Sequence, residues 1–133
     1  MNIVKDLFSA ACKTRLCAYA PYSDFKVGVA VYADNNEIYT GCNVENISYP
    51  CGTCAESGAI ASMIAHGGKK IREILIVADS ADLITPCGAC RQRIAEFATP
   101  QTLVHLANLD GVQKSLTLEE LLPLSFASKE LKK

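Results

Sequence analysis

Apolar residues recur along the chain at two different intervals, and these intervals predict alternating helices and strands. Residues 3–18 repeat apolar side chains at helical spacing, whereas residues 26–34 alternate apolar positions as a strand does. By the same criteria we expect helices at 3–18, 54–68, 87–98 and 117–123, and strands at 26–34, 37–42, 70–79 and on both sides of an Asp110–Gly111 turn within 102–117.

The order of these elements predicts an α/β fold. Helices interleaved with strands of this length indicate a sheet covered on both faces, here a three-layer α/β/α sandwich with a five-stranded mixed sheet. We expect the strands of the opening hairpin to be antiparallel and the strands linked by a helix to be parallel. Residues 1–133 should form a single domain, and the irregular, polar stretch at 43–53 has the composition of a functional loop.

Charge and cysteine content narrow the class of protein. The chain has 133 residues, 13 basic and 14 acidic, with a net charge of −1 and no basic stripe, so we expect no nucleic acid partner. No segment is apolar enough to predict a membrane span or a signal peptide. Seven cysteines, an odd number, then favour reduced thiols in the cytoplasm over a disulfide scaffold.

Four of the cysteines stand in two similar motifs, Cys51-Gly-Thr-Cys54 and Cys87-Gly-Ala-Cys90. Three interpretations are open. The four thiolates could hold a structural zinc ion, the first pair could be a redox dithiol at a helix start, or three thiolates could hold a catalytic zinc with one position left for water.

The position of Glu56 favours the catalytic interpretation. Cys54, Cys87 and Cys90 each fall at or within the first turn of a predicted helix, where backbone N–H groups stabilise thiolates, whereas Cys51 lies in the loop. Glu56 lies in the same first turn as Cys54. A fourfold thiolate site gains nothing from this carboxylate, but hydrolysis at an open zinc position needs such a proton carrier.

The spacing Cys54-Ala-Glu56, followed by Pro86-Cys87-Gly-Ala-Cys90, resembles the zinc deaminase signature. The resemblance is to the small cytidine deaminases of the three-cysteine, homotetrameric type. It extends over nearly the whole chain, through "AYAPYSDFKVGVAV", "GCNVENISYP", "CAE", "PCGACRQ" and "EELLPLSF" in the order typical of that family.

The resemblance implies specific roles. Cys54, Cys87 and Cys90 would hold one Zn²⁺, and Glu56 would carry protons while hydroxide attacks C4 of the pyrimidine, giving uridine and ammonia. The substrate-binding residues implied in the same way are Phe25 beside the base, Asn43 and Glu45 at the ribose, Ala55 through its backbone, and Tyr49 and Phe126 at a neighbouring subunit's site.

One position departs from the pattern. The family usually follows "CAE" with arginine, which offsets the charge of the thiolates, but this chain has Ser57. Arg91, beside Cys90, could offset part of this charge, although arginine is usual at that position and is no replacement. We expect zinc to bind nevertheless, with a somewhat less reactive water. Cys51 is expected to be a buried or half-buried thiol, and Cys12, Cys17 and Cys42 to be small packing residues. His66 and His105 lack ligand spacing and are expected to be structural.

The favoured function is therefore deamination of cytidine and 2′-deoxycytidine in pyrimidine salvage. A related alternative is a deaminase of the blasticidin-S type, which shares the zinc chemistry. An alternative of another class is a non-catalytic zinc module that uses Cys51 as its fourth ligand.

Overall fold

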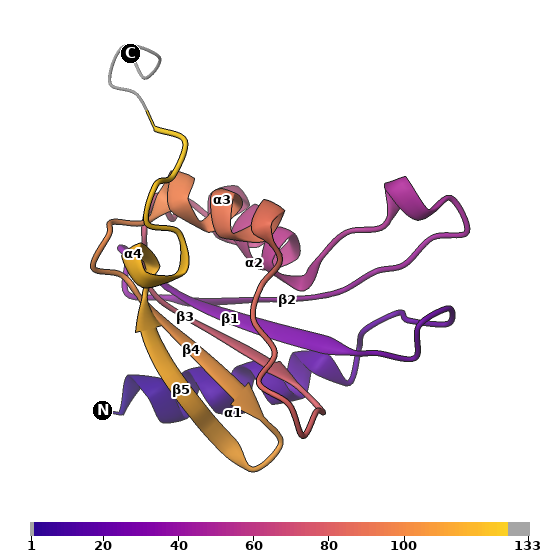
Figure 1. The fold of residues 1–133 in the computed structure, drawn as a ribbon. Helices are drawn as coiled ribbons and strands as arrows, with labels where there is room; N and C mark the ends of the chain where they lie inside the picture. Colours follow the sequence, from indigo (N-terminus) through magenta and orange to yellow (C-terminus); the bar gives the residue numbers. More distant parts are fainter. Residues whose placement is uncertain (1, 128–133) are drawn as a thin grey trace.

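The computed structural model describes residues 2–127, which form a three-layer sandwich (Figure 1). A five-stranded sheet of order β2-β1-β3-β4-β5 lies between α1 on one face and α2 and α3 on the other. The predicted fold class is confirmed. The elements are α1 (Ile3–Arg15), β1 (Val27–Ala33), β2 (Ile38–Cys42), the 3₁₀ turn η1 (Tyr49–Cys51), α2 (Ala55–Ala65), β3 (Ile71–Ala78), α3 (Gly88–Phe97), β4 (Leu103–Asn108), β5 (Gly111–Thr117) and α4 (Leu118–Leu121).

Strand directions follow the predicted connections. The hairpin strands β1 and β2 are antiparallel, and β1 also pairs antiparallel with β3. The crossover through α3 makes β3 and β4 parallel, and β5 returns antiparallel after the Asp110–Gly111 turn. Gly111 has a φ of +132°, a backbone conformation that glycine adopts without a steric penalty.

Alternation along the central strands divides the core between the two faces. Val29 and Val31 point to the α2–α3 side with Met63 and Ile94, and Ala30 points to the opposite side, beneath α1. Successive side chains of a strand point to opposite faces, so β1 contributes to both layers. This two-sided burial holds α2 and α3 in fixed positions over the sheet.

Close backbone contact fixes α2 against the edge strand β2. A Cβ atom at Gly41 would lie 2.2 Å from the backbone nitrogen of Ala59, a distance that no side chain can occupy. Glycine at position 41 therefore lets α2 lie directly on β2. Because Cys54 and Glu56 stand at the beginning of α2, this contact also positions them.

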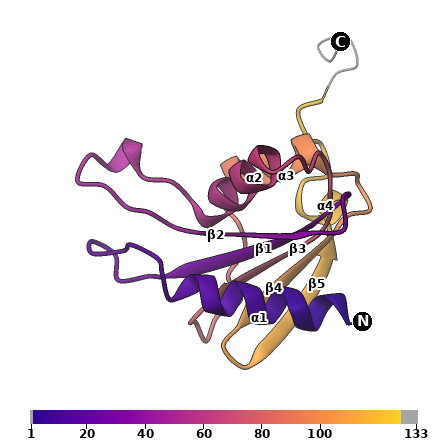
Figure 2. The same ribbon diagram turned by 180° about the vertical axis from the view of Figure 1, so that it is seen from behind.

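Two loops extend together beyond the sheet, as both views show (Figures 1 and 2). A bridge between Tyr19 and Val44 joins them, and a bridge between Val44 and Thr53 pairs the two ends of the second loop. Two differences from the sequence prediction occur here. The first helix ends at Arg15 rather than at residue 18, and the loop at 43–53 contains the short turn η1, which was not predicted. Within residues 2–127, no helix combines the length and the apolar character that a membrane span needs.

Candidate metal centre and substrate cavity

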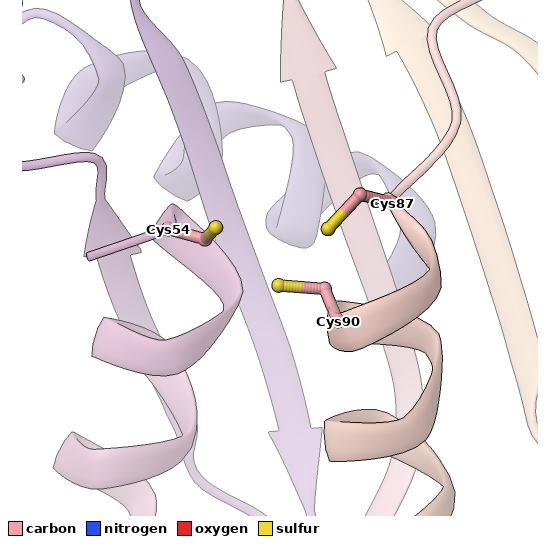
Figure 3. A group of neighbouring side chains, drawn as sticks. All are labelled: Cys54, Cys87 and Cys90. Carbon is pink, nitrogen blue, oxygen red and sulfur yellow. The ribbon is translucent and has the colours of Figure 1, made fainter. Parts of the chain in front are cut away.

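Three cysteine thiols converge at the beginnings of α2 and α3 (Figure 3). Cys54 is the N-cap residue of α2, Cys87 is the N-cap residue of α3, and Cys90 follows in the first turn of α3. Neither N-cap side chain makes a capping hydrogen bond. The sulfur atoms point toward one another instead and all lie within 4.8 Å of each other.

This donor set fits zinc. Zn–S bonds of about 2.3 Å in a tetrahedral arrangement place sulfur atoms about 3.8 Å apart. A limit of 4.8 Å for the three thiols therefore requires only small side-chain adjustments. Among the described residues, Cys51 is not part of this group, so the cage has three ligands and a fourth side that can remain open.

The thiols differ in their electrostatic surroundings. Hydrogen bonding from the backbone N–H of Cys90 lowers the pKa of Cys87, as expected for a thiol at a helix N-terminus. Burial raises the pKa of Cys90, and the nearby Glu56 carboxylate raises it further. A buried thiolate beside a carboxylate needs a cation for stability, and a divalent metal ion supplies that charge.

Glu56 is buried next to the cage, with 6% of its surface exposed. Burial raises the pKa of its carboxyl group, while hydrogen bonding from its own backbone N–H acts in the opposite direction. A carboxyl group with a raised pKa holds its proton more readily than an ordinary glutamic acid, which suits a group that must both accept and donate protons.

A cavity of about 420 Å³ opens onto this group and has the size of a small-ligand site. It brings together four residues that the sequence predicted for substrate binding: Phe25, Asn43, Glu45 and Ala55. Glu56, Cys54 and Cys87 line the same cavity. Its remaining lining residues were not predicted, namely Val27, Val44, Gly52, Thr53, Ile76, Ile84, Thr85 and Pro86. Val27, Val44 and Pro86 stood within the quoted stretches without being assigned a role, whereas Ile76 and Ile84 carried no signal distinct from ordinary apolar residues.

Comparison with known proteins finds relatives that share the fold and a zinc-binding region. The family described as "Cytidine and deoxycytidylate deaminase zinc-binding region" matches residues 1–106. The chain belongs to this family. A cytidine deaminase from Sporosarcina psychrophila is 41% identical over 96% of this chain and 94% of its own length. The zinc cofactor follows from the family's zinc-binding region and the three-cysteine group.

Solved structures of deaminases have the same fold. The crystal structure of a cytidine deaminase from Burkholderia pseudomallei has a TM-score of 0.86 and 40% identity, covering 92% of this chain and 98% of that one. A cytidine deaminase from Mycobacterium tuberculosis has a TM-score of 0.82 at 33% identity, covering 93% and 97%. A blasticidin-S deaminase from Bacillus cereus is less similar, at 33% identity over 79% of this chain and 81% of its own.

Asn43 and Glu45 have well-defined partners at the cavity mouth. The Oδ1 atom of Asn43 accepts from the backbone N–H of Val27 at 2.8 Å, and its Nδ2 atom donates to the carbonyl of Phe25 at 2.9 Å. A primary amide carries two N–H hydrogens, so a second one remains to donate to a ligand. The Glu45 carboxylate accepts from the backbone N–H groups of Tyr22 and Ser23 and from the Ser23 hydroxyl.

Tyr49 and Phe126 lie outside this cavity. Each side chain is 75% exposed. Tyr49 packs edge to face on Tyr22, with ring centroids 6.0 Å apart. The backbone of Phe126 is held by the side chain of Gln92. Phe126 is not among the residues that line this cavity, and Tyr49 lines a second pocket that shares Glu45 and Gly52 with it.

Two expectations for the other cysteines were wrong. Cys51 is exposed rather than buried, because it lies in the turn η1 on the projecting loop, where its Sγ atom is 3.4 Å from Ser48 Oγ. Cys17 is also exposed, because α1 ends before it, at Arg15. Cys12 packs at the edge of the α1 core, as expected for a small apolar residue.

Arg91 does not contact the cage. Its guanidinium donates to the carbonyls of Pro86 and Leu121 and to the hydroxyl of Thr85, and so joins α3 to the segments around it. The expected help from Arg91 with thiolate charge is thus not seen. His66 and His105 are structural, as predicted: His105 bridges Glu73 and Ser115 within the sheet, and His66 caps α2.

Proposed function

We propose that this protein hydrolyses cytidine and 2′-deoxycytidine to uridine and 2′-deoxyuridine with release of ammonia. One observation carries the proposal: a buried glutamic acid faces the same cavity as the open side of a three-thiol metal cage. A structural zinc site has no use for this carboxyl group, whereas hydrolysis at carbon requires a group that both accepts and donates protons.

The chain's own residues would perform the proton transfers. When bound by Cys54, Cys87 and Cys90, zinc supplies a Lewis acid that makes water a nucleophile near neutral pH. Glu56 takes the proton from that water and delivers it to N3 of the pyrimidine. It then passes the second proton of the water to the amino group on C4, which leaves as ammonia. The carbonyl of the product retains the oxygen of the water.

The cavity mouth would select a nucleoside. Glu45 would accept from a ribose hydroxyl, and Asn43 would donate its remaining N–H to the sugar. Phe25 would lie against the base, and the backbone of Ala55 at the beginning of α2 would orient the pyrimidine. A site whose polar groups are matched to a hydroxyl discriminates against ligands that lack it.

We also propose a homotetramer whose sites are shared between subunits. The supporting observation is the exposure of large apolar side chains at the two places concerned: Ile47 and Tyr49 on the projecting loop are 81% and 75% exposed, and Phe126 is 75% exposed. Apolar surface of this kind is typical of a protein interface. In this arrangement Tyr49 and Phe126 complete a cavity of the neighbouring copy.

The state of the cysteines supports our proposal that the protein acts in the cytoplasm. All seven cysteines are unpaired, three of them in a metal cage, which suits a reducing cytoplasm. A single domain over residues 1–133 that acts on free nucleosides would serve pyrimidine salvage, with no nucleic acid or membrane partner.

The test uses purified protein with its zinc content measured in the same sample. Cytidine, 2′-deoxycytidine, free cytosine and blasticidin S are supplied in parallel, and ammonia release is followed. We expect one zinc per chain and turnover of the two nucleosides in preference to the others. Zinc-loaded, folded protein that releases no ammonia would identify the non-catalytic module instead, and preferential turnover of blasticidin S would identify the antibiotic deaminase.

A further inference from the structure

The cage and its proton carrier together hold more negative than positive charge. Three thiolates and an ionised Glu56 bring four negative charges, and Zn²⁺ offsets two of them. Cys90 and Glu56 are buried, so water screens this excess poorly. A site of this kind is more stable with a fixed cation beside it.

Arg93 is in the right place to be that cation. It follows Cys90 by three residues on α3, so both side chains lie on the same helix face. Its Nη1 atom donates to the Sγ atom of Cys90 at 3.3 Å. The guanidinium also interacts electrostatically with the thiols of Cys54 and Cys87 and with the carboxyl group of Glu56. Arg93 therefore contacts Cys90 directly and acts on the other charged groups of the centre only through its electrostatic field.

The residues of α2 that face Arg93 carry no positive charge. A cavity of about 380 Å³ lies between α2 and α3, lined by Ser57, Ile60, Ala61, Arg93, Glu96 and Phe97. Ser57 is too short to extend a charged group across this space, whereas Arg93 donates to the Cys90 sulfur from the other side. The same space would admit a long side chain from position 57.

We propose that Arg93 is a positioning residue of the zinc cage. Its guanidinium holds the Cys90 thiolate by a charged hydrogen bond and so supplies the positive charge that an arginine at position 57 would otherwise supply. Hydrogen bonds to metal ligands orient them and adjust their donor strength. A guanidinium keeps its charge at any physiological pH, so the contact persists whether or not Glu56 is protonated. The inference rests on the proposed zinc site, and not on which nucleoside is the substrate.

The alternative is that Arg93 is a surface arginine without influence on the metal, since much of its side chain is exposed. The two cases differ in zinc affinity. For Arg93→Gln we expect zinc to transfer to a competing chelator with an apparent affinity about 10- to 100-fold weaker than in the wild type. Arg72→Gln is the matched control, because Arg72 is an exposed strand residue that contacts Asn36 and Asp34. The Arg72→Gln substitution should leave zinc affinity unchanged.

A second substitution, at Ser57 on the other side of the cavity, tests whether Arg93 acts through its charge or only through packing. In the Arg93→Gln background, Ser57→Arg should recover most of the lost zinc affinity, because it places a guanidinium in the same space from α2. Arg93→Lys, which keeps the charge but not the planar donor, should fall between the wild type and Arg93→Gln. Circular dichroism of the zinc-loaded proteins checks the fold of each variant.

Zinc affinity of Arg93→Gln equal to that of the wild type would overturn the proposal. A loss that Ser57→Arg does not repair, in protein that is folded, would also overturn it, because it assigns Arg93 to packing alone. None of these measurements depends on catalysis. A wild type that binds zinc but does not deaminate cytidine would therefore contradict the proposed function and leave this inference standing.

Discussion

Glu45 illustrates how a neighbouring side chain prepares a residue for binding. The hydrogen bond from the Ser23 hydroxyl is the main cause that lowers the pKa of its carboxyl group, with further lowering by the backbone N–H groups of Tyr22 and Ser23. The carboxylate form, which accepts from a sugar hydroxyl, is therefore present above the lowered pKa and lost as the pH falls through it.

Ser23→Ala should move this loss to higher pH. Removal of the hydroxyl raises the pKa of Glu45 toward the ordinary value for glutamate, about 4.3. As the pH is lowered toward that value, KM for cytidine should then begin to rise at a higher pH than in the wild type, while kcat follows the wild-type profile. A ¹³C NMR titration of the Glu45 carboxyl group gives the same shift directly. Superimposable titrations of the two proteins would contradict the role of Ser23.

The grouping of the three thiols, with Glu56 beside them, could be predicted because it depends on local structure. Cys54, Glu56, Cys87 and Cys90 all belong to two helix beginnings, and their relation to the helix N-termini depends on neighbouring residues only. The exposure of Cys51 and the partners of Arg91 could not be predicted in this way. Both depend on how distant segments fold back, the loop at 43–53 in one case and the end of α4 in the other.

The close packing of α2 on β2 at Gly41 determines where the zinc ligand Cys54 lies. Gly41→Ala should cost about 1–3 kcal/mol of stability, because the added Cβ would lie 2.2 Å from Ala59 N and force α2 outward. Since α2 carries Cys54, zinc affinity should fall with stability. Thermal unfolding and chelator competition measure both quantities.

Gly88→Ala is the control for this prediction. Gly88 stands directly after the ligand Cys87, but a Cβ atom at this position would have no other atom within 4 Å, and the φ of Gly88 is not positive. The substitution should therefore leave both stability and zinc affinity near wild type. Equal losses in the two variants would show that glycine at 41 has no special part in positioning α2.

Strand order shows the limit of prediction from elements alone. The antiparallel hairpin and the parallel β3–β4 pair followed from the lengths of the connections. The position of β1 next to β3, with β2 at the edge, did not follow from the connections. Gly28 and Gly41 show only that α1 and α2 pack closely on opposite faces of the β1–β2 pair. A pattern of apolar residues gives the face of each strand but not its neighbours.

Shared sites make a prediction for the whole assembly. Glu56→Gln protein and Phe126→Ala protein should each be nearly inactive, but mixed oligomers should regain activity. In a random mixture roughly a quarter of the sites would join an intact Glu56 to a neighbour's intact Phe126, so about a quarter of the wild-type rate should return. Ammonia release after subunit exchange measures this.

The complementation needs two reference samples. Each variant is incubated alone under the same exchange conditions, and the mixture is compared with the sum of their rates. A mixture no more active than that sum would show that Phe126 does not serve a neighbouring subunit's site.

The most direct test of the central claim is to measure zinc per chain and ammonia release for Glu56→Gln and for Cys51→Ser. A three-thiol cage served by a proton carrier predicts that Glu56→Gln keeps its zinc and loses at least about 10²–10⁴-fold in kcat. Cys51→Ser should retain both zinc and activity, because its thiol lies outside the cage. The reverse pattern, with zinc lost from Cys51→Ser and Glu56→Gln unaffected, would contradict the account.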